Sequence, residues 1–300
     1  MMIQTQNLRK SYGTTPALRG INLQVQPGEL FGLIGPDGAG KTTLIRILAT
    51  LLLADEGSAQ LDHKDVVADY RAIRRSIGYM PGRFSLYQDL TVEENLTFFA
   101  TIFGTTIEEN YELIRDIYVQ LEPFKDRRAG KLSGGMKQKL ALCCALIHKP
   151  TVLLLDEPTT GVDPVSRQEF WEMLQRLKAK NITILVSTPY MDEASLCDRV
   201  ALMQDGAILQ VDEPDSIVNS YDKPLLAVKT ANIYQLIQDL RQFEPAHTVF
   251  PFGEYVHLSL KSVVWPELIH GYLLDRGHAD IEIKQAMPTI EDIFMEKSQV

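Results

Sequence analysis

Residues 35–42 combine glycines, a lysine and a threonine in the pattern G-x-x-x-x-G-K-[ST]. A glycine-rich turn of this kind points several backbone N–H groups at one place, and a helix that starts there adds the positive end of its dipole. Lys41 can reach the terminal phosphates of a nucleotide, and the Thr42 hydroxyl can bind Mg²⁺. The pattern therefore predicts a site for a nucleoside triphosphate with Mg²⁺. The residues expected to contact the nucleotide are Gly35, Pro36, Asp37, Gly38, Ala39, Gly40, Lys41, Thr42 and Thr43.

The stretches on either side of this turn support the same interpretation. Glu29–Ile34 has the apolar character of a short buried strand, and Thr43–Leu48 has the spacing of an amphipathic helix. A glycine-rich turn without chemical function is the alternative. The pattern binds phosphate where a strand leads into the turn and a helix leaves it, so the context favours nucleotide binding.

Two adjacent carboxylates, Asp156 and Glu157, end the apolar run Val152–Leu155. In a parallel sheet the carboxyl ends of the strands face the ligand crevice, so these acids are expected to meet the triphosphate. We expect Asp156 to hold Mg²⁺ and Glu157 to act as the catalytic residue that orients or deprotonates a water molecule. The alternative is a strand that ends in solvated acids. The phosphate loop earlier in the chain favours the catalytic interpretation.

Ser133, Gly134 and Gly135 precede a predicted helix that runs to about Ile147. Glycine N–H groups and a serine hydroxyl at a helix N-terminus form a second possible anion site. A Ser-Gly-Gly turn by itself is more often only a helix entry. One chain holds one triphosphate, which the first loop already binds. The second site therefore suggests contact with a nucleotide that another copy presents.

Composition limits the classes of partner. The chain has 300 residues, with 39 acidic and 30 basic side chains and a net charge of −9, which argues against a nucleic-acid partner. Cys143, Cys144 and Cys197 lack metal-ligand spacing and are expected to be small buried residues in a reducing compartment. No run approaches the ~18 apolar residues of a membrane span, and no signal segment is evident. We expect a cytoplasmic protein that reaches a membrane only through a partner.

The order of predicted elements indicates an α/β protein followed by a smaller domain. Strands alternate with helices, which implies a parallel sheet covered on both faces, and the opening strands 3–8 and 17–25 are expected to add an antiparallel edge. Residues 91–94 have the spacing of a helix capping box, and Asp205-Gly206 predicts a hairpin. After about Asn219 the order becomes βαββαβ, the plan of a ferredoxin-like α+β domain. The predicted limits are 1–218, with a helical subdomain at about 84–150, and 219–300.

Together these motifs resemble the nucleotide-binding subunits of ATP-binding cassette (ABC) transporters. Residues 35–42 match the phosphate loop of that family, and 152–157 its magnesium strand with the catalytic glutamate. Residues 132–136 match its signature loop, with Met136 where glutamine is commoner, and 158–164 match the loop that crosses its dimer interface. Tyr12 fits the aromatic residue that stacks on adenine. The resemblance covers residues 1–218, and the tail 288–294 is similar to the closing segment of exporter-type subunits.

The resemblance implies a P-loop NTPase cassette with a mixed sheet and a helical subdomain, which binds ATP with Mg²⁺ and hydrolyses it. It also implies a head-to-tail homodimer or heterodimer, in which Ser133, Gly134 and Gly135 contact the nucleotide of the facing subunit. The implied third partner is a multi-span membrane permease, which would place this chain on the cytoplasmic face of the membrane. The segment that contains Phe84, Leu86, Tyr87 and Leu90 lies where the family receives the coupling helix of that permease, although ordinary packing is an equal alternative.

Two positions depart from the family pattern. Gly82 stands where a glutamine normally contacts magnesium and water, and Pro189 stands where a histidine normally contacts the γ-phosphate. Neither residue has a side-chain donor or acceptor, and the loss of one transition-state contact commonly lowers a rate by about 10²–10³. We expect ATP to bind and hydrolysis at this chain's own phosphate loop to be weak.

Two other classes of protein share part of this pattern. A soluble cassette ATPase that acts on ribosomes or DNA usually carries two cassettes or long coiled-coil insertions, which this chain lacks. A P-loop small-molecule kinase has no use for the segment 132–136. His247, His257, His270 and His278 are not at metal-ligand spacing, and we expect them to be surface or packing residues.

Overall fold

The computed structural model describes residues 1–298 and divides the chain into two compact units, Met1–Glu213 and a second that starts at Pro214. The first unit contains two sheets. The antiparallel sheet has the order β2-β1-β4-β5, and the larger sheet has the order β10-β9-β3-β8-β7-β6. The strands of the antiparallel sheet are β1 (Ile3–Tyr12), β2 (Thr15–Val25), β4 (Glu56–Leu61) and β5 (Lys64–Asp65). Those of the larger sheet are β3 (Leu30–Ile34), β6 (Ile77–Met80), β7 (Val152–Asp156), β8 (Thr183–Thr188), β9 (Arg199–Gln204) and β10 (Ala207–Asp212).

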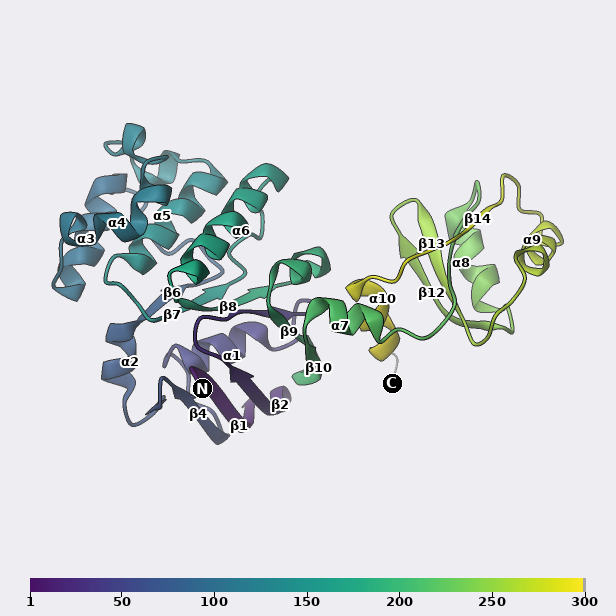
Figure 1. Ribbon diagram of the computed structural model, residues 1–300, viewed down its shortest axis with the longest axis horizontal. Coiled ribbons are helices and arrows are strands. Elements are labelled where there is room, and N and C mark those ends of the chain that lie inside the picture. Colours follow the sequence, from purple (N-terminus) through teal and green to yellow (C-terminus); the bar gives the residue numbers. More distant parts are fainter. Residues whose placement is uncertain (299–300) are drawn as a thin grey trace. The chain divides into compact units, whose positions relative to one another are not determined.

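Helices cover the larger sheet on both sides, as Figure 1 shows. The α-helices of the first unit are α1 (Lys41–Leu48), α2 (Tyr70–Ser76), α3 (Val92–Phe103), α4 (Ile107–Tyr118), α5 (Gly134–Leu146) and α6 (Pro164–Ala179). Short 3₁₀ helices are η1 (Glu122–Phe124), η2 (Ala129–Lys131) and η3 (Met191–Leu196). Helix α1 lies between the two sheets, where Leu44 and Ile47 belong to one buried cluster with Ile3 of β1 and Leu154 of β7. This packing fixes the start of α1 beside the ends of the parallel strands.

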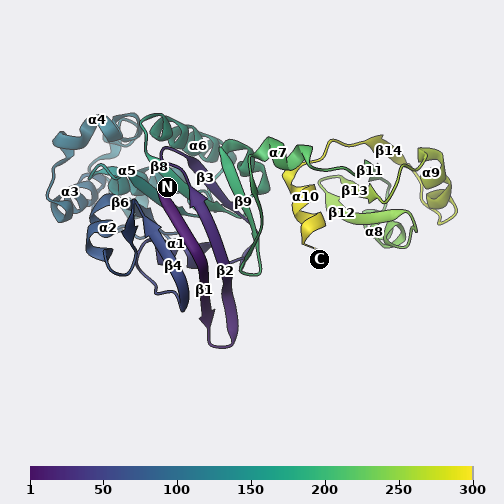
Figure 2. The same cartoon turned by 60° about the horizontal axis from the view of Figure 1, so that its bottom comes forward.

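The prediction of an α/β cassette with a mixed sheet is confirmed, and one detail of it is wrong. Strands β3, β6, β7, β8 and β9 are parallel, and β10 adds the antiparallel edge through its hairpin with β9. The opening strands do not join this sheet. They pair with each other, and β1 also pairs with β4, to form the separate antiparallel sheet, in which the strands run side by side (Figure 2). Strand β4 was not predicted because only Ala59 and Leu61 face inward, so its sequence lacks a clear apolar alternation.

Local signals predicted several element boundaries correctly. Thr91 and Glu94 form the capping box at the start of α3, with both reciprocal hydrogen bonds present. The hairpin at Asp205-Gly206 joins β9 to β10. The segment after Met191 is a 3₁₀ helix of six residues, whereas helices α2 and α4 were not predicted. The three cysteines are buried, and burial raises the pKa of each thiol, which keeps them protonated.

The second unit has the predicted βαββαβ order. Its elements are α7 (Pro214–Asn219), β11 (Leu225–Lys229), α8 (Ile233–Arg241), β12 (Ala246–Phe252), β13 (Tyr255–Leu260), α9 (Pro266–Leu274), β14 (Glu282–Gln285) and α10 (Ile290–Lys297). The sheet is antiparallel with the order β12-β13-β11-β14, the ferredoxin-like arrangement. His257 of β13 is buried and pairs with Asp292 of α10 at 2.7 Å, so it is a packing histidine with an acidic partner.

We expect Asp292→Asn to lower the free energy of unfolding of this unit by about 1–3 kcal/mol at pH 7, because a buried charged hydrogen bond is lost. Burial raises the pKa of Asp292, but hydrogen bonds from His257 and Thr289 outweigh it and hold the pKa below its usual value of 3.8. A carboxylate with a lowered pKa stabilises the fold above its unfolded-state pKa and loses that contribution as the pH falls through the folded value. Calorimetry should therefore show the deficit shrinking below pH 4.

Glu254→Gln is the matched control, because Glu254 pairs with Lys229 on the exposed surface of the same sheet. The transition temperature of Glu254→Gln should stay close to that of the wild type at pH 7 and at pH 3. A deficit of Asp292→Asn that is as large at pH 3 as at pH 7 would contradict the assignment to the charged carboxylate.

Candidate nucleotide-binding site

The phosphate loop occupies the turn between β3 and α1, as predicted. Gly40 caps α1 with a φ of 101°, and Gly38 has a φ of 82°. A Cβ on Gly40 would lie 2.5 Å from the Ala17 carbonyl oxygen, and one on Gly35 would lie 2.1 Å from that of Met203. A Cβ on Gly38 would meet no atom within 4 Å. The loop is therefore packed against the protein at Gly35 and Gly40 and open at Gly38, where a phosphate can approach the backbone.

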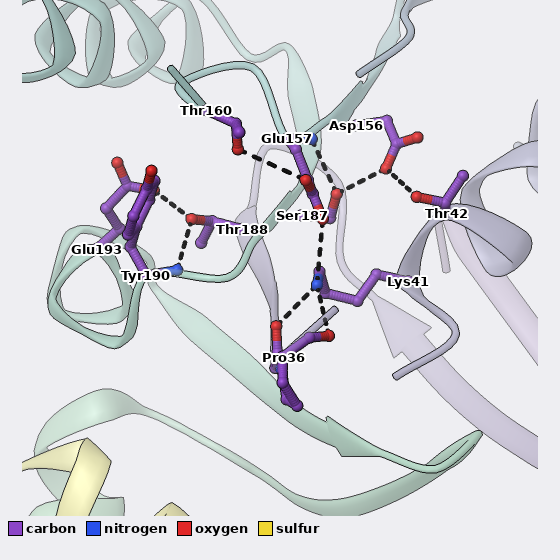
Figure 3. A network of polar contacts seen from close by, with 11 residues as sticks. Pro36, Lys41, Thr42, Asp156, Glu157, Thr160, Ser187, Thr188, Tyr190 and Glu193 are labelled. Carbon is purple, nitrogen blue, oxygen red and sulfur yellow. Dashed lines mark hydrogen bonds and ion pairs between the residues drawn. The ribbon is translucent and has the colours of Figure 1, made fainter. Parts of the chain in front are cut away.

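Lys41 is buried, with 3% of its surface exposed, and its ammonium group lies inside the loop. Its Nζ donates to the carbonyl oxygens of Gly35 at 2.7 Å and Pro36 at 3.0 Å. The same Nζ lies 3.2 Å from Oε1 of Glu157 (Figure 3). The structure thus brings together the predicted phosphate-binding cation and the predicted catalytic carboxylate.

Asp156 and Thr42 meet beside this pair. The Thr42 hydroxyl donates to Oδ1 of Asp156 at 2.9 Å, and the Ser187 hydroxyl donates to the same oxygen at 2.9 Å (Figure 3). One hydroxyl and one carboxylate oxygen are hard donors that suit Mg²⁺, which takes its remaining ligands from phosphates and water. Within residues 1–298 no group of three or more His, Cys, Asp or Glu could hold a metal ion.

Ser187 was missed by the sequence analysis. Besides its bond to Asp156, its hydroxyl and its carbonyl oxygen accept from the Glu157 N–H at 3.0 and 3.1 Å. Glu157 has a φ of 48°, which is uncommon for a residue with a side chain, and these bonds hold it there. Ser187 stands at the end of β8, the strand beside β7, so the only signal in the sequence was a polar residue at the carboxyl end of an apolar strand.

The phosphate loop and Glu157 border a cavity of about 230 Å³. It is lined by Ala17, Glu157 and residues 38–43. Gly35, Pro36 and Asp37 form the beginning of the same loop, directly after β3. Tyr12 lies at the end of β1 with half of its surface exposed, where a ring is available for stacking.

The second predicted anion site lies elsewhere in the first unit. Ser133 is exposed and caps α5, and its hydroxyl accepts from the Met136 N–H at 3.3 Å. Gly134 is exposed, and a Cβ on Gly135 would lie 2.6 Å from Oγ of Ser166 on α6. Among the described residues, this turn stands apart from those that line the phosphate cavity. At this turn Ser133 and Gly134 are exposed, whereas Gly135 is buried against α6.

The two departures from the family pattern also lie where they affect the site. A Cβ on Gly82 would be 3.1 Å from the carbonyl oxygen of Asp156 and 3.7 Å from its Oδ2. A longer side chain at this position would therefore reach the metal-binding acid. Pro189 directly follows Thr188, which is the last residue of β8, and so lies two positions after Ser187.

A larger hollow of about 430 Å³ lies between the larger sheet and helices α3 and α5. Its walls are mostly apolar and include Tyr79, Leu86, Phe99, Phe103 and His148. Ser85 and Leu86 of the segment 84–90 line it, and Tyr87 beside them is half exposed. The hollow adjoins Met80 and Pro81, which lead directly to Gly82.

The phosphate loop, the two acids and the order of the strands define a P-loop ATP-binding cassette. The family described as "ABC transporter" matches residues 18–160. The Nod factor export ATP-binding protein I of Rhizobium sp. (strain N33) is 34% identical and is matched over 98% of this chain and 95% of its own length. The chain therefore belongs to the ATP-binding proteins of ABC transporters, a family of ATPases.

Other relatives are ATP-binding proteins or cassettes of ABC transporters as well. The probable multidrug ABC transporter ATP-binding protein YbhF of Escherichia coli (strain K12) is 40% identical over 94% of this chain, which spans about half (49%) of the length of that protein. Among solved structures, the dimeric post-hydrolysis state of the cassette MJ0796, bound to ADP and Pi, matches 71% of this chain and 98% of its own with a TM-score of 0.65 and 26% identity. Within residues 1–298 the chain has no helix that could span a bilayer.

Proposed function

We propose that this chain is the ATP-binding and ATP-hydrolysing subunit of an exporter, held on the cytoplasmic face of the membrane by a multi-span permease. Relatives named for multidrug transport and Nod factor export support the exporter assignment. In this proposal residues 1–218 form the cassette, with its helical subdomain at about 84–150, and residues 219–300 form the small domain. The exported substrate is selected by the permease.

Each predicted site residue has a role in this proposal. Lys41 and the N–H groups of residues 35–43 hold the β- and γ-phosphates, while Tyr12 stacks on the base. Thr42 and Asp156 hold Mg²⁺, which supplies charge neutralisation at the phosphates. Glu157 polarises the attacking water once its carboxylate leaves Lys41.

One observation supports the dimer most directly. The turn that begins α5 offers a serine hydroxyl and glycine N–H groups, yet it lies apart from the cavity of its own chain. In a head-to-tail dimer, Ser133, Gly134 and Gly135 would contact the γ-phosphate held by the facing subunit, as an arginine finger does in other nucleotide hydrolases. A solved relative is a dimer with ADP and Pi, which agrees with this arrangement.

The apolar hollow beside Leu86 supports the permease as the third partner. A groove of about 430 Å³ with aromatic walls is large enough for the side chains of a short helix, and such grooves recognise the apolar face of a partner helix. We propose that the coupling helix of the permease docks there. Movement of that helix would reach the site through Met80 and Pro81, because these residues line the hollow and precede Gly82.

Mass measurement of the membrane complex, purified through this subunit, tests the proposal. We expect two cassettes per complex and, for the isolated chain with Mg·ATP, a dimer that Ser133→Arg prevents, because the larger side chain blocks the facing phosphate. Lys149→Ala is a control outside the site. Protomers alone in the presence of Mg·ATP, both free and in the membrane complex, would refute the proposed mechanism.

A further inference from the structure

Glu193 is a buried carboxylate close to the ATP site that the proposed function does not use. It belongs to η3 and is 2% exposed. Its Oε2 accepts hydrogen bonds from the hydroxyls of Thr159, at 3.1 Å, and Thr188. Its Oε1 lies 3.4 Å from Nε of Arg167 on α6. The two hydroxyl donors and the guanidinium fix this carboxylate in place. They also compensate its charge, since burial of an unpaired charge would cost folding free energy.

The two threonines lie beside the residues of the ATP site, Thr159 in the loop after β7 and Thr188 at the end of β8. Thr159 is two residues after Glu157, and Thr188 directly follows Ser187. Both threonines are buried, at 1% and 0% exposure. Ser187 in turn holds the N–H of Glu157 through its hydroxyl and carbonyl oxygens. One carboxylate oxygen therefore connects the loop after β7 to the end of β8.

The loop after β8 is fixed by a second contact of the same threonine. The Thr188 hydroxyl accepts from the Tyr190 N–H at 3.1 Å while it donates to Glu193 (Figure 3). These bonds close a turn around Pro189. Arg167 lies over the Tyr190 ring at 4.4 Å, so the turn, η3 and α6 form one connected group.

We propose that Glu193 is a positioning residue for ATP hydrolysis, which keeps Glu157 in its uncommon backbone conformation by fixing Thr159 relative to Thr188. This inference rests on the proposed function, because it assigns a role within the same ATP site. Glu193 touches neither the phosphate loop nor Lys41 among its contacts, so it acts on the hydrolytic step and leaves nucleotide binding intact.

The test compares Glu193→Gln with Asp192→Asn. The two carboxylates are neighbours and both pair with Arg167, but Glu193 alone contacts the threonines, and Asp192 is exposed. We expect Glu193→Gln to lower kcat at least tenfold, while affinity for a non-hydrolysable ATP analogue with Mg²⁺ stays within threefold. Asp192→Asn should stay within twofold in both. Thr159→Val should lower kcat as Glu193→Gln does. Thr159→Ser should have a kcat close to that of the wild type, because it keeps the hydroxyl.

Hydrogen exchange of the nucleotide-free chain provides a readout that does not depend on turnover. In Glu193→Gln and in Thr159→Val, the amides of residues 157, 159–163, 190 and 191 should exchange at least tenfold faster, with those of β7 and β8 unchanged. Equal kcat and equal exchange in Glu193→Gln and Asp192→Asn would overturn the inference, as would a parallel loss of binding and kcat. A wild-type chain that does not bind the analogue would refute the proposed function instead, whereas the exchange result would still decide whether Glu193 holds the two loops.

Discussion

Lys41→Ala is expected to weaken ATP binding at least 100-fold and to abolish hydrolysis. Lys41 is the buried cation of the phosphate cavity, and its three N–H donors face the loop carbonyls and Glu157. Hydrogen bonds to charged groups contribute about 1.5–3 kcal/mol each, and a loss of about 3 kcal/mol is more than a 100-fold change in affinity. Titration calorimetry with Mg·ATP and a phosphate-release assay measure the two effects.

Lys125→Ala is the control for this substitution. Lys125 pairs with Glu93 on the exposed surface, where an ion pair contributes little. Its ATP affinity and rate should equal those of the wild type. If Lys41→Ala bound ATP with unchanged affinity, the cavity around residues 38–43 would not be the phosphate site. A thermal denaturation curve separates loss of binding from loss of folding, since removal of Lys41 also leaves Glu157 without its cation.

Gly82→Gln combined with Pro189→His is expected to raise the hydrolysis rate about 100-fold. The two substitutions return donors and acceptors to positions beside Asp156 and after Ser187, and one preorganised contact to the transition state commonly contributes about 10²–10³ in rate. A Cβ on Gly82 would lie 3.1 Å from the Asp156 carbonyl oxygen, so a small shift of the loop accommodates the new side chain. Phosphate release at saturating Mg·ATP, measured on the membrane complex, gives the rate.

The single variants and one added substitution serve as controls. Each single variant should raise the rate less than the pair does. Glu157→Gln, added to the pair, should remove the gain, because the restored contacts act on a water molecule that Glu157 polarises. An unchanged rate in the double variant would show that the two missing side chains do not limit hydrolysis.

Much of the cassette was predictable because its signals are local. The phosphate loop was predictable because its glycines, lysine and threonine stand at fixed spacing within eight residues, and glycine readily adopts the positive φ values found at Gly38 and Gly40. Asp156 and Glu157 were predictable because a parallel strand places its carboxyl end at the ligand edge. The capping box at Thr91 and the βαββαβ order of the second unit likewise follow from short-range patterns.

The tertiary structure alone decided which residues meet these motifs. Strand β8 begins 27 residues after the end of β7 in the chain but is its neighbour in the sheet, so no sequence spacing indicated that Ser187 would hold Asp156 and Glu157. The same pairing placed Thr159 and Thr188 on one oxygen of Glu193. The opening strands were assigned to the wrong sheet because strand order depends on long-range hydrogen bonds and packing around α1. The sequence by itself thus determined the phosphate loop and its acids, whereas the contacts that hold those acids in place arise only when distant segments pack together.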